Sequence, residues 1–156
     1  MAKHQLIVYL DSLRAGHSYI EMVDPDTEEN SVYGFYPEKF DEKKEVLVDI
    51  GSLKADRERL ESSRASEQVN LIEKHYDLDE SEYDRACAYL ENERSNPSWY
   101  FLVGYNCIDF IQDLLVATRD DEIDHFANDF TDAELEELSW VGTYAKAHKL
   151  LNRVVV

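Results

Sequence analysis

The chain has 156 residues, and 16 Lys and Arg against 34 Asp and Glu give it a formal net charge of −18 at pH 7. This length suits a single domain, 1–156, and a hydrophobic fraction of 44% with ten tyrosines and six phenylalanines suffices for a core and argues against disorder. The charge argues against sequence-independent nucleic-acid binding, because few cations can neutralise phosphates, and it disfavours anionic membrane surfaces.

Membrane insertion and signal-directed export are not expected. No apolar run approaches the roughly 18 residues that a spanning helix requires. Residues 1–5 followed by the apolar run 6–10 are too short and too soon polar for a signal peptide. Two cysteines, Cys87 and Cys107, are too few for a disulfide framework. We therefore expect a protein of the cytoplasm of the producing cell, and secretion by a route without a signal peptide stays open.

The first fifty residues are predicted to form strands. β-Branched and aromatic residues favour extended structure here. The segment 24–30 is dense in turn residues and separates two extended segments, which together predict a β-hairpin. The expected strands are 5–10, 17–23, 31–36 and 45–50, the last ended by Gly51.

Helices are predicted for most of the remaining chain. A helical segment is expected at about 53–93, and Thr131 and Glu134 have the spacing of a capping box that opens a final helix. Between these lie an expected short strand at 99–103 and a helix at about 107–117. The apolar residues at helical spacing are Val69, Ile72 and Tyr76 in the first region, then Tyr83, Ala86, Cys87 and Leu90, and Leu135, Leu138, Val141, Ala145 and Leu151 in the final helix.

Cys107 is a candidate nucleophile. It follows a strand, a glycine and Asn106, so it is expected in the first turn of a helix, where Asn106 is a favourable N-cap and Asp109 can return the bond in a capping box. The positive end of the helix dipole lowers a thiol pKa, and the first N–H groups of a helix can form an oxyanion hole. The alternative is a buried core cysteine, which is the role predicted for Cys87 in the middle of its helix.

A thiolate nucleophile needs an imidazole that takes up its proton and delivers it to the leaving group. Among five histidines His17 is the strongest candidate, because it follows a glycine and opens a strand on the side opposite Ile20 and Met22. A structural histidine is the alternative. The others are His4 in the N-terminal tail, His75 and His148 on predicted helices near charged neighbours, and His125 among carboxylates.

Three motifs together resemble a known superfamily. They are Gly16-His17-Ser18-Tyr19-Ile20-Glu21, Tyr33-Gly34-Phe35-Tyr36-Pro37 and Tyr105-Asn106-Cys107-Ile108-Asp109-Phe110. Their order is similar to that of circularly permuted papain-like proteins of the NlpC/P60 superfamily, in which the histidine hairpin precedes the cysteine helix. The Asn-Cys-x-x-Phe run also resembles the lecithin:retinol acyltransferase branch, and the set is similar to small bacterial amidase-like and toxin domains. The resemblance covers 16–37 and 99–116.

The resemblance implies an α+β fold, with an antiparallel sheet packed on helices and the catalytic Cys107 at a helix N-terminus. It implies His17 as general acid/base and a polar residue on the next strand that orients the imidazole. Folding the hairpin about residues 26 and 27 brings His17 opposite Tyr36, with Glu38 just beyond, so these are the candidates for the third position. The acyltransferase branch has a second histidine there, which this chain lacks.

Neither acidic cluster predicts a metal site, and no cofactor is expected. The segment 24–28 has alternate carboxylates like the start of a calcium loop, but Glu29 stands where a glycine is needed and Phe35 where the bidentate glutamate belongs. The run 120–125 resembles solvated acidic surface more than a site for a divalent ion.

The leading hypothesis is a cysteine hydrolase of amide bonds: a peptidase, an amidase or a deamidase. The expected partner is a peptide or protein amide, and the resemblance to bacterial effectors adds a cognate immunity protein or a secretion machinery. Two alternatives remain. One is a thioester-forming acyltransferase on the same fold. The other is a non-enzymatic acidic inhibitor or immunity-type protein that binds a basic partner by electrostatic steering. Salt adaptation would also explain the charge.

Overall fold

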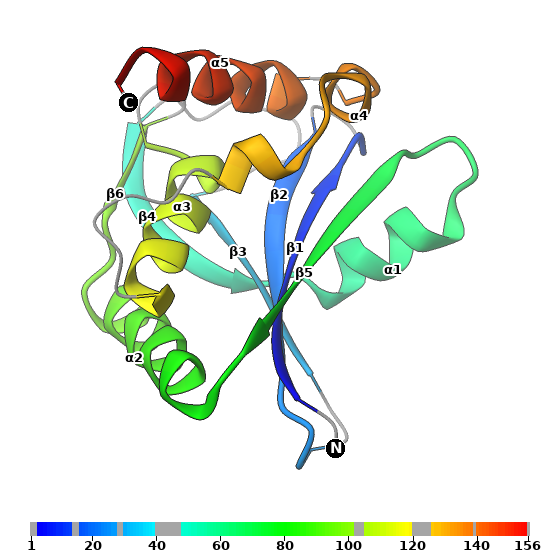
Figure 1. Ribbon diagram of the computed structural model, residues 1–156. Helices are drawn as coiled ribbons and strands as arrows, with labels where there is room; N and C mark the ends of the chain where they lie inside the picture. Colours follow the sequence, from blue (N-terminus) through cyan, green and yellow to red (C-terminus); the bar gives the residue numbers. More distant parts are fainter. Residues whose placement is uncertain are drawn as a thin grey trace.

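A six-stranded antiparallel sheet organises the computed structural model of this chain (Figure 1). The structure describes residues 3–13, 16–27, 30–39, 48–101, 105–119, 126–138 and 140–155. The strand order is β5-β1-β2-β3-β4-β6. The strands are β1 His4–Asp11, β2 His17–Val23, β3 Ser31–Pro37, β4 Val48–Ala55, β5 Leu71–Leu78 and β6 Trp99–Phe101.

Helices cover both faces of the sheet, but unequally (Figure 1). One helix, α1, lies on one face, where Leu60 packs against Ile7, Tyr9, Tyr19 and Val32 in a small core. The remaining helices lie on the other face and enclose the larger core with the sheet. The helices are α1 Arg57–Ala65, α2 Glu80–Ser95, α3 Cys107–Arg119, the 3₁₀ turn η1 Phe126–Asp129, α4 Asp132–Glu136 and α5 Trp140–Val155.

The apolar run in β1 explains how one strand serves two cores. Side chains alternate between the faces of a strand. Leu6, Val8 and Leu10 therefore enter the larger core, while Ile7 and Tyr9 enter the core under α1. A buried strand was predicted at 5–10, and the structure confirms it.

The predicted hairpin is confirmed together with its register. Ile20 lies opposite Tyr33 and Met22 opposite Ser31, which corresponds to a fold about residues 26 and 27. Within the described residues of β2 and β3, pairing covers only these positions and the one between them. The two strands therefore separate toward His17 and Tyr36, and α3 contacts both strands.

The prediction of a continuous helical segment at about 53–93 is wrong. β4 continues through Gly51 to Ala55, so Gly51 does not end the strand, and β5 occupies 71–78. At Gly51 the ring of Phe35 fills the space that a Cβ would need, so the glycine serves packing here. Part of the strand predicted at 45–50 and of the one at 99–103 lies outside the described residues.

β5 was mistaken for a helix because its apolar spacing fits both periods. Ile72 and Tyr76 are four residues apart, which places them on one face of a helix and also on one face of a strand. In the structure they and Leu78 pack on the larger core, while β5 pairs along its whole length with β1. Tertiary pairing with a buried neighbour therefore decided this segment.

The final helix is divided in two. The capping box is confirmed, because the Thr131 hydroxyl accepts from the Glu134 N–H and the Glu134 carboxylate accepts from the Thr131 N–H. However, α4 ends at Glu136 and α5 begins at Trp140. The chain folds back so closely that a Cβ at Gly142 would meet the carbonyl oxygen of Leu135, which a single straight helix would not allow.

The predicted α+β class with an antiparallel sheet is therefore confirmed. Among the described residues, no helix has the length and apolar character that would let it cross a membrane.

Candidate active site

Cys107 begins α3, as predicted. The Asn106 side-chain oxygen accepts from the Ile108 N–H at 2.9 Å, so Asn106 caps the helix through its second residue, and the predicted return bond is present because the Asp109 carboxylate accepts from the Asn106 N–H at 3.0 Å. The following inner face of the helix, from Ile108 to Leu115, anchors α3 in the larger core. Cys107 itself is only 3% exposed.

His17 opens β2 and reaches the thiol where β2 and β3 separate. The His17 imidazole and the Cys107 thiol each shift the pKa of the other, which places them side by side although they are ninety positions apart in the chain. The backbone N–H of Ser18 also lies against the thiol. The structure therefore brings together the two residues that sequence reasoning singled out as a pair.

Asp56 completes the arrangement, and sequence reasoning missed it. The His17 Nε2 atom lies 3.2 Å from Asp56 Oδ2, and the Tyr36 hydroxyl donates to Asp56 Oδ1 at 2.6 Å. The Tyr36 ring stacks on the imidazole with the ring centroids 4.3 Å apart. Asp56 follows β4 and precedes α1, and its side chain does not cap that helix. Its carboxylate is therefore free to bind the histidine.

Gly34 makes room for this cluster. A Cβ at Gly34 would collide with Asp56 Oδ2 and would lie 2.7 Å from His17 Nε2. Any other residue at this position would displace the carboxylate, the imidazole or both. The glycine in the Tyr33–Pro37 motif thus has a steric reason in the structure.

Hydrogen bonds from α1 hold Asp11, which lies next to His17 in the sheet. The Arg59 guanidinium donates two hydrogen bonds of 2.8 Å to the buried Asp11 carboxylate and a third of 2.9 Å to the Leu13 carbonyl. The Ser63 hydroxyl also donates to Asp11 at 3.0 Å. Asp11 is the cross-strand neighbour of His17. These bonds tie α1 to the end of β1 and so restrain the chain that leads into β2.

Electrostatics favour a thiolate beside a protonated imidazole. Burial alone would raise the pKa of Cys107, but the positive charge of the neighbouring His17 outweighs it, and the pKa of the thiol falls below its usual value. Burial alone would lower the pKa of His17, but the negative charge of Cys107 and the hydrogen bond to Asp56 outweigh it and raise the pKa. Both shifts favour the charged pair.

Glu38, the other candidate for the third position, lies apart from this cluster. It is exposed in the turn after β3, where its backbone N–H bonds the Ile50 carbonyl. Tyr36 contacts the site, but through Asp56 and by stacking. The orienting carboxylate therefore comes from the end of β4. Because the sequence prediction placed 53–93 in one helix, it concealed the strand end that presents Asp56.

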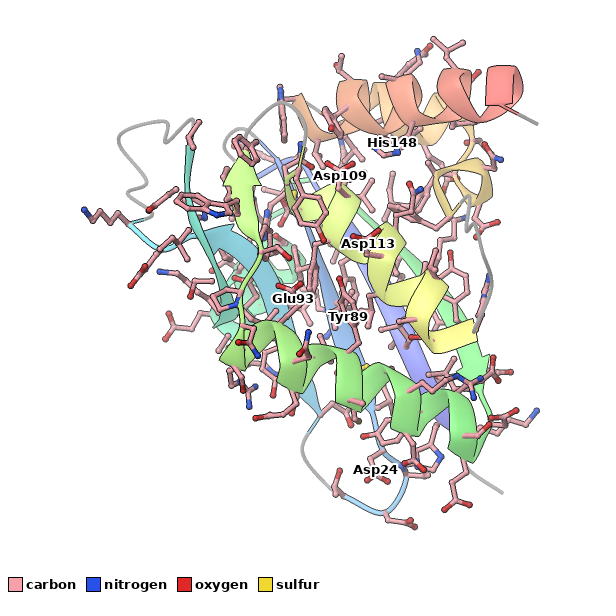
Figure 2. All side chains as sticks on the ribbon, turned by 90° about the vertical axis from the view of Figure 1, so that its left-hand side faces the viewer. Asp24, Tyr89, Glu93, Asp109, Asp113 and His148 are labelled. Atoms are coloured by element: carbon pink, nitrogen blue, oxygen red, sulfur yellow. The ribbon has the colours of Figure 1, made fainter. Side chains whose placement is uncertain are left out.

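The remaining candidates lie elsewhere. Cys87 is exposed, so its prediction as a core residue is wrong: the buried face of α2 passes through Ala86 and Leu90. His148 on α5 lies 3.1 Å from Asp109, on the side of the molecule seen in Figure 2. His75 pairs with Glu73 and His4 with Asp24.

No group of side chains in the described part of the chain could hold a metal ion. Asp24 instead accepts from the Asp26 N–H within its turn. The run 120–125, including His125, lies outside the described residues.

Comparison of the chain with protein-family models, curated proteins and solved structures finds no match. Any assignment of function therefore depends on the chemistry of the residues themselves.

Proposed function

We propose that this chain is a cysteine-dependent hydrolase of amide bonds on a circularly permuted papain-like fold. The observation that carries the proposal is the series Cys107–His17–Asp56, in which the imidazole lies beside the thiol and is bonded to the carboxylate, with the thiol at the N-terminus of α3. A nucleophile, a base within hydrogen-bonding reach and a third group that orients the base are the parts that nucleophilic catalysis requires.

Each group has a role in the reaction. The Cys107 thiolate attacks the carbonyl carbon, and the charge that develops on the oxygen is stabilised by N–H groups at the start of α3, among them that of Cys107. The C–N bond breaks as the His17 imidazolium gives its proton to the leaving nitrogen. Water then attacks the thioester with His17 as base, which releases a carboxylic acid and restores the Cys107–His17 pair.

Asp56 selects the nitrogen of His17 that serves the thiol. Because the Nε2 atom is bound to Asp56 Oδ2, the Nδ1 atom is left for Cys107. The carboxylate also stabilises the imidazolium that exists before the leaving group is protonated. The Tyr36 hydroxyl donates a hydrogen bond to the other carboxylate oxygen of Asp56, which restricts the rotation of that side chain.

An amide substrate is preferred to an acyl-transfer reaction between lipids. The third group here is a carboxylate rather than the second histidine of the acyltransferase branch. The net charge of −18 further opposes work at an anionic membrane, and it also disfavours an anionic cell wall as substrate. A peptide, an isopeptide or a side-chain amide of a protein target is therefore the proposed substrate class, as expected for an effector that acts inside a cell.

Thiol alkylation tests the proposal, with Cys87 as the internal control. The protein is treated with limiting iodoacetamide from pH 4 to 9, and the modified cysteine is identified by mass spectrometry. The pKa of Cys87 is raised, chiefly by partial desolvation of this otherwise exposed thiol, so it should react only at alkaline pH. Cys107 should react well below pH 8, and His17→Ala should move its midpoint to higher pH. The midpoint reports the pKa even where low exposure slows the reaction.

Reaction of Cys107 only at the urea concentrations that unfold the protein would overturn the proposal. Cys107 would then be a core residue, and the acidic surface would direct the search toward a basic protein partner.

A further inference from the structure

A buried hydroxyl that the proposed mechanism does not yet use lies next to the nucleophile. Ser18 follows His17 in β2, and only 1% of its surface is exposed. Within the part of the chain that the structure describes, its Oγ atom has no hydrogen-bond partner. Most buried hydroxyls are paired, because an unpaired one loses its bonds to water and gains none in return. A buried hydroxyl of this kind beside a reactive group therefore indicates a partner that is present only during the reaction.

The Ser18 side chain lies on the face of the sheet that α3 covers. Side chains alternate along a strand, so Ser18 shares its face with Ile20 and Met22. These two side chains belong to the larger core, which also contains Cys107. In the described residues β2 pairs with β3 only as far as Ile20, and α3 contacts both strands where they separate. Ser18 thus lies in the gap that the start of α3 enters.

The backbone of Ser18 fixes its distance from the nucleophile. Its N–H lies against the Cys107 thiol, so its hydroxyl is only three covalent bonds from a group in contact with the sulfur. The sulfur already has the His17 imidazole and this N–H as neighbours. The hydroxyl is therefore left for an atom that the nucleophile attacks.

The reaction at Cys107 needs such a donor. Attack on a carbonyl places a negative charge on its oxygen, and donors already in position stabilise that charge best. The start of α3 supplies backbone N–H groups, but the helix cap uses one of them, because the Ile108 N–H donates to the Asn106 side chain at 2.9 Å. The Cys107 N–H is the donor next to the thiol on the helix side. A second donor has to come from the neighbouring strand, where Ser18 lies.

We infer that the Ser18 hydroxyl is the second donor of the oxyanion hole and acts together with the Cys107 N–H. As the sulfur bonds to the carbonyl carbon, the electron pair of the C=O π bond moves to the oxygen, and Ser18 donates a hydrogen bond to it without giving up its proton. The pair returns to the C=O bond when the C–N bond breaks and the leaving nitrogen takes the proton of His17. This inference rests on the proposed function, since it adds a catalytic residue to that reaction.

Two small reagents separate stabilisation of the oxyanion from formation of the thiolate. p-Nitrophenyl acetate acetylates a thiolate through a tetrahedral oxyanion and releases p-nitrophenolate, whereas iodoacetamide alkylates it by displacing iodide and forms no oxyanion. The parent protein carries Cys87→Ser, so that Cys107 is its one thiol, and the rate of ester cleavage by a Cys107→Ala variant is subtracted. Dividing the rate constant for ester cleavage by that for alkylation, at one pH, cancels changes in the thiolate fraction.

Ser18→Ala should lower this ratio at least about tenfold and leave the pH midpoint of alkylation unchanged. Tyr19→Phe is the matched control and should leave the ratio as it is. The Tyr19 hydroxyl is likewise buried and has no partner among the described residues, but its side chain lies in the core under α1, on the other face of the sheet.

An unchanged ratio in Ser18→Ala would overturn the inference while iodoacetamide still modified Cys107. A raised alkylation midpoint with an unchanged ratio would show that the hydroxyl serves the thiolate, which overturns the inference as well. So would a parent protein whose Cys107 reacts with iodoacetamide but cleaves no ester, since no oxyanion hole would then be in place. If iodoacetamide modified Cys107 only in the unfolded protein, the proposed function itself would fail.

Discussion

Replacement of Asp56 by asparagine isolates the charge that the structure places against His17. The Asp56 carboxylate lies 3.2 Å from Nε2, and both side chains are almost fully buried. The substitution preserves shape and an acceptor oxygen but removes the negative charge. The imidazolium then loses a favourable partner, so the pKa of His17 falls. The thiolate loses part of its positive neighbour, so the pKa of Cys107 rises.

The magnitude follows from the distance and the burial. Coulomb's law at 3.2 Å and an effective dielectric constant of about 20 gives an upper bound of about 5 kcal/mol. Mutational values for a hydrogen bond to a charged group are about 1.5–3 kcal/mol, and the retained asparagine oxygen places the effect at the lower end. One pKa unit corresponds to about 1.4 kcal/mol, so we expect a shift of about one unit.

The assay is the pH dependence of Cys107 alkylation in Asp56→Asn. The midpoint should rise by about one pH unit, and the rate at any pH below both midpoints should fall by about tenfold, because the thiolate fraction there changes tenfold per unit. Asp49→Asn is the matched control: Asp49 is a carboxylate within β4 that lies on the surface, bound to the Lys39 and Ile50 N–H groups. An unchanged midpoint in a correctly folded Asp56→Asn protein would refute the coupling between Asp56 and the pair.

Three further substitutions test the geometry. Gly34→Ala should displace the His17 ring, since the new Cβ would lie 2.7 Å from Nε2, and should raise the alkylation midpoint of Cys107 toward that of an ordinary thiol; an unaltered midpoint would show that the cluster tolerates the methyl group. Asn106→Ala removes the cap of α3 and should lower the free energy of unfolding in urea by about 1 kcal/mol; a loss under 0.3 kcal/mol would contradict the role of the cap. Leu60→Ala, at a side chain with no exposed area, should cost about 2–5 kcal/mol in the same measurement, and a near-neutral result would mean that α1 contributes little to the fold.

Local sequence signals predicted several parts of the site correctly. The turn residues and the alternation around them defined the β2–β3 register, and Asn106 with Asp109 defined the start of α3. These features depend on residues a few positions apart, whose backbone geometry is set by short-range sterics and hydrogen bonds. The pairing of Cys107 with His17 was predicted by resemblance, and their catalytic roles stay a prediction.

The wrong predictions concern segments whose structure depends on contacts with distant parts of the chain. β5 has an apolar spacing that serves either period, and its pairing with β1 made it a strand. Cys87 has the spacing of a core residue, yet the face of α2 that meets the larger core passes through Ala86.

By itself the sequence determined the α+β class, the hairpin that carries His17 and the helix start that carries Cys107, because each is encoded by a local pattern. Only the tertiary structure decided that Asp56, rather than Glu38, meets the imidazole and that β4 and β6 expose apolar side chains. Both depend on how β4 is placed in the sheet between β3 and β6. Such placement results from the burial of many side chains at once, which no short segment of the sequence specifies.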